Sequence, residues 1–416
     1  MTSGLGAPAP GAFPLGGAVT IAQLTDDPHP VLARLRAAEP VSWLPVLGGW
    51  LVTRRDLAEQ VLRDPDGFTV DDPRFTTARV VGPSMLSLDG PEHRRHRDPF
   101  ARALRRGDVS AGLSAFTRNE ADRLVAGLAA AGVAGVAGVA GVAGVAGGRA
   151  ELRRGLAGPL AVTVMKEVLG LGDTDPAVLL AWYDAIVAGV SALPPGSGGP
   201  VPEPAAAAFG ELRASLEAAI GRPGASCLLA VAARTAGLSA GEVVSNAAVM
   251  LFGGIETTEG MICNAVWHLL GHPGQAGRLT ADRSGLDGAV DESLRLEPAA
   301  AVVDRYATAD VRLGGADLRG GDLVVVSLAG ANRDPAMFPE PDQFDIRRTN
   351  ARQNLGFALG PHFCVGAELA RRETRAAITA LLDHLPGLRL DPEQPGAPRG
   401  LVFRKPPALH VLWDVE

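Results

Sequence analysis

The chain has 416 residues, of which 47% are hydrophobic and 20% are charged, as in a globular protein with a sizeable core. The net charge of −7 argues against a nucleic-acid partner, because a phosphate-binding surface needs an excess of basic residues. The three cysteines, Cys227, Cys263 and Cys364, are odd in number and far apart, which excludes a disulfide framework and any CxxC pair.

The first elements of the chain predict helices with a few short strands. Residues 1–20 are rich in proline and glycine and carry no signal-peptide pattern, so we expect a flexible leader. Helical patterns follow over 27–40, 90–106 and 150–171. Because strand candidates are short and scattered, without βαβ alternation or a clear linker, we expect one mainly α domain over 21–416.

A simple repeat interrupts this pattern, with glycine at every third position from Gly132 to Gly147. The uncharged stretch that contains it, Leu124 to Gly148, exceeds the length of a membrane span. Alanine and glycine gain little from hydrocarbon, however, so a membrane span is disfavoured. We expect residues 132–147 to form a surface loop without a function of its own.

A long central helix is predicted to begin after Ser239, which forms a capping box with Glu242, and to end near Gly271. The stretch 243–255 is almost uncharged and is expected to be buried on all sides. Within it, Gly253 and Gly254 each cost about 1 kcal/mol relative to alanine. Taken alone, this glycine pair favours a kink or a close helix–helix contact over a bound group.

The C-terminal third presents one cysteine on a rigid loop. The run FALGPHFCVG (357–366) places Cys364 just before a predicted helix, where free backbone N–H groups favour a thiolate. Without a second cysteine or histidine ligand nearby, zinc is disfavoured. A lone thiolate on such a loop suits axial ligation of a haem iron.

Together with the upstream motifs GGIETT (253–258) and ESLR (292–295), this loop resembles the cytochrome P-450 family of haem-thiolate monooxygenases. The resemblance covers nearly the whole chain, with the motifs in the family's order and spacing. It implies a single large helical domain with small antiparallel β-sheets around a buried haem b. It also implies a monooxygenase that inserts one oxygen atom of O2 into an apolar organic substrate, in secondary metabolism.

The resemblance assigns roles around the haem. Cys364 would be the iron ligand, Phe357 would pack near the sulfur, and Gly360 and Gly366 would let the loop approach the porphyrin. The basic residues that match the family's propionate partners are His93, Arg97, Arg305 and His362.

The same resemblance assigns the acid–alcohol pair Glu256 and Thr257 to proton delivery, with Gly253 and Gly254 making room for dioxygen. Glu292 and Arg295 match the family's structural ion pair.

Two positions depart from the family pattern. Ala358 stands where the haem loop usually has glycine, and Gln343 stands where an arginine often completes the ion network. We expect the alanine to be tolerated and the network to be either weaker or hydrogen-bonded differently. Small apolar residues are expected to line the substrate pocket: Val249, Ile255, Ala300, Val302 and Val303. The remaining cysteines, Cys227 and Cys263, are expected to be core thiols.

The family resemblance also sets the expected partners. We expect a monomeric cytoplasmic enzyme, without membrane or nucleic-acid contacts, that acts on a free or carrier-bound small molecule. NAD(P)H electrons would arrive through a separate ferredoxin or flavodoxin and its reductase. Oxidative coupling, a peroxide-driven enzyme and a non-catalytic haem protein are the alternatives, and the Glu256–Thr257 pair disfavours the last two.

Overall fold

The chain divides into two compact units, each built from separated segments. The computed structural model describes residues 8–9, 11–105, 107–137, 147–193, 200–222, 227–235 and 237–415. Unit 1 comprises Met1–Phe68, Arg118–Gly158 and Thr257–Glu416, and unit 2 comprises Thr69–Thr117 and Pro159–Glu256. Because the segments of the two units interleave along the chain, a single domain over 21–416 stays a prediction.

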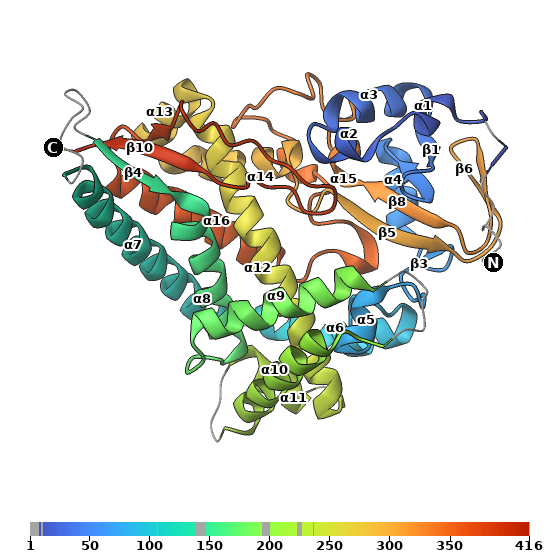
Figure 1. The fold of residues 1–416 in the computed structure, drawn as a ribbon, viewed down its shortest axis with the longest axis horizontal. Helices are drawn as coiled ribbons and strands as arrows, with labels where there is room; N and C mark the ends of the chain where they lie inside the picture. The colour runs from blue at the N-terminus through green and yellow to red at the C-terminus, as the bar shows by residue number, and fades with distance from the viewer. Residues whose placement is uncertain are drawn as a thin grey trace. The chain divides into compact units, whose positions relative to one another are not determined.

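The helices dominate both units (Figure 1). Up to residue 192 the α-helices are α1 (Pro14–Gly17), α2 (Ile21–Thr25), α3 (His29–Ala38), α4 (Arg55–Arg63), α5 (Thr76–Val81), α6 (Gly90–Arg105), α7 (Gly107–Ala137), α8 (Gly158–Leu169) and α9 (Pro176–Ala192). They are followed by α10 (Glu203–Gly221), α11 (Leu228–Thr235), α12 (Ala240–Leu270), α13 (Pro273–Ala281), α14 (Leu286–Leu296), α15 (Leu328–Ala331) and α16 (Ala367–His384). A π-helical turn, η1 (Arg153–Ala157), leads into α8, and 3₁₀ turns occur at η2 (Arg283–Gly285), η3 (Ala351–Gln353) and η4 (Gly360–His362).

The strands form three small sheets. In chain order they are β1 (Val41–Leu44), β2 (Gly49–Val52), β3 (Phe68–Thr69), β4 (Gly147–Glu151), β5 (Val302–Ala307), β6 (Val311–Leu313), β7 (Ala316–Leu318), β8 (Leu323–Ser327), β9 (Arg389–Leu390) and β10 (His410–Asp414). The sheet orders are β1-β2-β8-β5-β3, β4-β10-β9 and β6-β7. The mainly α fold with small sheets is therefore confirmed. One pairing differs from the expected antiparallel pattern, because β2 runs parallel to β8.

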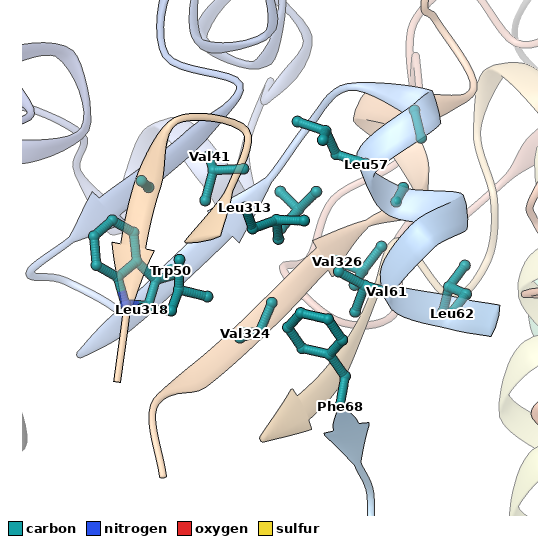
Figure 2. Close-up of a cluster of buried hydrophobic side chains, with 14 of the residues drawn as sticks. Val41, Trp50, Leu57, Val61, Leu62, Phe68, Leu313, Leu318, Val324 and Val326 are labelled. Atoms are coloured by element: carbon teal, nitrogen blue, oxygen red, sulfur yellow. The ribbon is translucent and has the colours of Figure 1, made fainter. Parts of the chain in front are cut away.

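The five-stranded sheet separates two apolar clusters of unit 1. We call the first the α4-side cluster; Figure 2 shows side chains of α4, β2 and β8 meeting in it. Its buried members are Val41, Trp50, Val52, Leu57, Ala58, Val61, Leu62, Phe68, Leu313, Ala316, Leu318, Val324, Val326, Leu328, Ala331 and Leu355. The second, the α3-side cluster, contains Leu32 and Leu35 of α3 with Leu51 and Val325. Successive strand residues point to opposite faces, which explains why Val324 and Val325 belong to different clusters.

The central helix α12 begins where the sequence predicts. Ser239 Oγ accepts from the Glu242 backbone N–H at 3.3 Å, and a carboxylate oxygen of Glu242 accepts from the Ser239 N–H at 2.8 Å. Farther along, the Asn246 amide nitrogen lies 2.9 Å from the buried ring of His96 on α6. Residues 243–249 are buried as expected, but Gly253 is exposed, so the fully buried stretch is shorter than predicted.

The expected leader is partly folded. The ring of Phe13 packs edge-on against Trp50 with centroids 5.0 Å apart, and Val19 is buried. The backbone N–H groups of Leu15 and Gly16 donate to the Glu39 carboxylate at 2.9 and 3.0 Å. The prediction of a flexible leader is therefore wrong from Phe13 onward, because apolar and polar partners lie within reach. Residues 1–7 and 10 lie outside the described residues.

The prediction of a surface loop over 132–147 is wrong at both of its ends. Helix α7 continues through Ala137, and Gly147 already belongs to β4, which pairs with β10. Alanine is the strongest helix former, and it offsets the glycines at the start of the repeat. Residues 138–146 lie outside the described part of the chain. Within the described part, no helix is long and apolar enough to cross a membrane.

Candidate functional site

The cysteine loop is closed by its own backbone. The Cys364 N–H donates to the Phe357 carbonyl at 2.9 Å, and the Phe363 N–H donates to the Gly360 carbonyl at 3.1 Å. Gly360 has φ +72°, and a Cβ there would lie 2.3 Å from the Leu62 carbonyl oxygen of α4. Only glycine fits such a left-handed position at this close approach. The loop therefore holds an exposed Cys364 thiol just before α16.

Phe357 is fixed by a residue that sequence reasoning missed. The guanidinium of Arg371, on α16, lies 4.7 Å from the centre of the Phe357 ring, within the range of a cation–π contact. Arg371 is itself held by Asp291 of α14 through a 2.8 Å hydrogen bond from Nε. The ring of Phe363 also meets Phe357 edge-on at 6.4 Å. The position of Arg371 in the second turn of α16 gave no signal in the sequence, because Phe357 and Asp291 come from other segments.

Glu292 and Arg295 form the expected ion pair, fully buried, with Arg295 Nε 2.7 Å from a Glu292 oxygen. Of the two expected alternatives, the structure shows different hydrogen bonding, because Arg348 supplies a second guanidinium, with Nε 2.9 Å from Glu292. Gln343 contributes its backbone carbonyl, which accepts from Arg295 at 3.0 Å. A carbonyl needs no particular side chain, so the departure at Gln343 is harmless. Arg295 also donates to the carbonyls of Asn332 and Pro341.

Arg305 lies on the same side of the five-stranded sheet as the cysteine loop. It is buried, and it pairs in register with Val324 of the α4-side cluster, so the two side chains share a face. That cluster includes Leu355, and Leu359 of the cysteine loop packs against it. His362, the other predicted propionate partner of unit 1, ends η4 within this loop.

The remaining predicted propionate partners belong to unit 2. His93 and Arg97 are four residues apart on α6 and therefore share one face of that helix. His93 is buried and Arg97 is half-buried.

The two adjacent glycines of α12 have different surroundings. A Cβ on Gly254 would lie 2.3 Å from the sulfur of Met165 on α8, so this glycine serves a helix–helix contact. A Cβ on Gly253 would meet nothing within 4 Å. The assignment of Gly254 to a bound group is therefore replaced by packing, and Gly253 keeps its assignment as a prediction. Glu256 and Thr257 follow Gly253 at i+3 and i+4, so all three share one face of α12.

Glu256 also accepts a hydrogen bond that the sequence did not indicate. The hydroxyl of Tyr183, on α9, donates to a Glu256 carboxylate oxygen at 2.6 Å.

The predicted pocket residues do not form one group. Val302 packs against the α3-side cluster, and Val303 packs against the α4-side cluster, because neighbours on a strand point to opposite faces. The prediction that both line one pocket is therefore wrong. Ala300 is half-buried and bridges to Phe403, and in unit 2 Val249 and Ile255 are buried side chains of α12.

The donor set fits a haem better than a metal ion held by protein alone. Among the described residues, no three or more His, Cys, Asp or Glu side chains are grouped as metal ligands. Cys364 instead offers one exposed sulfur, and a Cβ on Gly366 would lie 4.0 Å from it. One thiolate leaves the other coordination positions of an iron to a porphyrin, as in haem-thiolate sites. The cation of Arg305, on the same side of the sheet, suits a porphyrin carboxylate.

Comparison with known proteins decides the family. The family model "Cytochrome P-450" matches residues 205–410. The monooxygenase PikC of Streptomyces venezuelae is 36% identical over 380 residues, which cover 88% of this chain and 85% of that protein. The chain belongs to the cytochrome P-450 family. A second member, the 20-oxo-5-O-mycaminosyltylactone 23-monooxygenase of Streptomyces fradiae, is 34% identical over 86% of this chain and 82% of its own length.

Solved structures agree with this assignment. Cytochrome P-450 CYP109Q5 from Chondromyces apiculatus has a TM-score of 0.80 at 28% identity, covering 95% of this chain and 97% of that one. P450BioI, solved in complex with a ligated acyl carrier protein, has a TM-score of 0.80 at 25% identity, covering 94% and 100%. The chain is therefore a P-450 monooxygenase, as the sequence motifs implied.

Proposed function

We propose that this P-450 inserts one oxygen atom of O2 into an apolar small molecule of secondary metabolism, with electrons from a separate ferredoxin or flavodoxin and its reductase. The observation that carries the proposal is the exposed Cys364 thiol on a loop closed by backbone hydrogen bonds. A bound haem b would supply oxygen activation, for which a cysteine thiolate favours O–O cleavage.

Side chains of this protein are proposed to hold the haem. Cys364 ligates the iron, and the free N–H groups at the start of α16 stabilise its thiolate form. Arg305 and His362 of unit 1 would bind propionate carboxylates, and the same role is proposed for His93 and Arg97 within unit 2. Phe357, whose ring lies 4.7 Å from the Arg371 guanidinium, would pack near the sulfur and tune its environment.

Proton delivery falls to the acid–alcohol pair of α12. Glu256 takes protons from solvent, and Thr257 positions the water molecule that passes them on. Gly253, with open space on its side, leaves room for that water and for dioxygen.

The substrate class is proposed from relatives of known name. One relative is named as a 20-oxo-5-O-mycaminosyltylactone 23-monooxygenase, and another as a mycinamicin IV hydroxylase/epoxidase from Micromonospora griseorubida. Within unit 2, the buried Val249 and Ile255 of α12 offer apolar side chains for such a substrate. A carrier-bound substrate is compatible with the acyl carrier protein complex of P450BioI.

The iron ligand is tested by the absorption spectrum of the reduced protein with carbon monoxide. Wild type is expected to show the red-shifted Soret band of thiolate-ligated haem, and Cys364→Ala is expected to lose it. Cys227→Ala, which changes a half-buried cysteine of unit 2, is the matched control and keeps the band. A wild-type protein without the band, or a C364A protein that retains it, contradicts the proposal.

A further inference from the structure

A hydrogen bond of unit 2 that has no role so far joins α9 to the acid of α12. Tyr183 is 7% exposed, and its hydroxyl donates to a carboxylate oxygen of Glu256 at 2.6 Å. A tyrosine hydroxyl is a neutral donor, so it holds the carboxylate without adding a charge beside it. Tyr183 is one of two tyrosines in the chain, and it lies in none of the sequence motifs described above.

The surrounding turn of α12 is held on two sides. Phe252 precedes Glu256 by four residues, so both lie on the face of α12 that meets Tyr183. The rings of Tyr183 and Phe252 lie 5.9 Å apart at a tilt of 47°. On another side, Met165 of α8 occupies the space beside Gly254. The packing of Phe252 and Gly254 therefore fixes the backbone of this turn. The hydrogen bond from Tyr183 then determines the direction of the Glu256 side chain.

We propose that Tyr183 is a positioning residue for Glu256, and that it keeps the carboxylate where the acid can pass protons from solvent toward Thr257. The inference rests on the proposed function, in which RH, O2, two electrons and two protons give ROH and H2O. The electrons come from NADPH through the redox partners. Glu256 gives up each proton that it takes from solvent, so it ends unchanged, and Tyr183 keeps its own proton throughout.

The first test measures how fast protons arrive. Tyr183→Phe keeps the ring that packs on Phe252 and removes only the hydroxyl, so the variant is expected to fold. NADPH oxidation is followed with a plant-type ferredoxin and its reductase, in H2O and in D2O. We expect the rate to fall several-fold and the ratio of the H2O rate to the D2O rate to increase, because proton delivery becomes the slow step.

The matched control is Trp182→Phe, on the same helix. It removes a 2.6 Å hydrogen bond from the indole N–H to Glu211 of α10 and leaves Glu256 untouched. We expect W182F to keep the wild-type rate ratio. An unchanged or smaller ratio in Y183F, or an equal increase in W182F, overturns the inference.

The second test does not depend on turnover. Tyr183→Phe, Glu256→Ala and the double variant form a cycle in which the urea midpoint of unfolding is measured. If the two side chains are bonded, the effects of the single changes do not add, and Y183F has little further effect in the E256A background. Additive shifts overturn the inference.

The two proposals fail separately. Loss of the thiolate band in wild type overturns the proposed function. A normal band together with additive midpoints or an unchanged isotope ratio overturns only the role of Tyr183.

Discussion

At the scale of single residues, the buried ion network shows how two arginines share one carboxylate. Glu292 is fully buried and meets both Arg295 and Arg348. Burial alone lowers the pKa of Arg295, and the hydrogen bond to Glu292 acts in the opposite direction. The backbone carbonyls that surround Arg295 complete its hydrogen bonds. A buried charge without its partner is costly, so Glu292 is the critical member.

Glu292→Gln is expected to reduce the free energy of unfolding by about 3–5 kcal/mol, because it leaves two guanidinium groups without a counter-charge. The measurement is urea unfolding of the purified protein. Glu368→Gln is the control: Glu368 is 60% exposed, and its partner Arg371 keeps the hydrogen bond to Asp291, so its loss should cost less than about 1 kcal/mol. Equal costs for the two variants would show that burial does not set the strength of the network.

At the scale of elements, the cysteine loop carries two left-handed residues with opposite consequences. Ala358 has φ +57° and Gly360 has φ +72°. A left-handed conformation costs an L-residue such as alanine roughly 1–2 kcal/mol, whereas glycine adopts it readily. The alanine at the position of the usual glycine therefore places strain in the loop, and its tolerance stays a prediction.

Ala358→Gly is expected to stabilise the protein by up to about 1 kcal/mol, since the relief of strain exceeds the extra chain entropy of glycine, about 0.4–1 kcal/mol. Gly360→Ala is the opposite case, because its Cβ would also lie 2.3 Å from the Leu62 carbonyl. Thermal unfolding of the two variants should shift the midpoint in opposite directions. A lower midpoint for A358G would mean that the loop is not strained at this position.

At the scale of the whole molecule, buried titratable groups of unit 1 set the response to acid. Burial lowers the pKa of His268 to about 3, while its ring lies 2.9 Å from Ser293 Oγ. Burial alone would raise the pKa of Glu297, but the hydrogen bonds and charges of His29 and Arg404 lower it to about 2. In both cases the unfolded chain binds a proton at a pH where the folded chain does not. Stability therefore falls as the pH drops.

His268 is expected to lower stability by up to about 1.4 kcal/mol per pH unit as the pH falls from 6.5 to 4.5, and Glu297 is expected to lower it below pH 4.5. The buried Glu373 acts in the opposite direction, because burial raises its pKa. His268→Asn removes the titrating ring and keeps a partner for Ser293. It should lower stability at pH 7 but flatten the decline between pH 6.5 and 4.5. The check is thermal unfolding at several pH values, and parallel curves for wild type and H268N would contradict the assignment.

Helices with strong local signals were predictable across the molecule. The capping box at Ser239 and the helix-breaking residues from Gly271 to Pro273 predict both ends of α12, because these signals act over a single turn. The leader and the repeat were misjudged, because local composition does not reveal distant partners. Phe13 is fixed by Trp50, and the start of the repeat is absorbed into α7.

The sequence by itself determined the family and singled out Cys364 as the predicted iron ligand, because the cysteine loop, GGIETT and ESLR are contiguous motifs that carry their chemistry in residue type and spacing. Only the tertiary structure decided which side chains support them. Arg371 on Phe357, Arg348 on Glu292 and Tyr183 on Glu256 each come from a different element. Pairwise contacts over such separations depend on how helices and strands pack, and no local spacing encodes them.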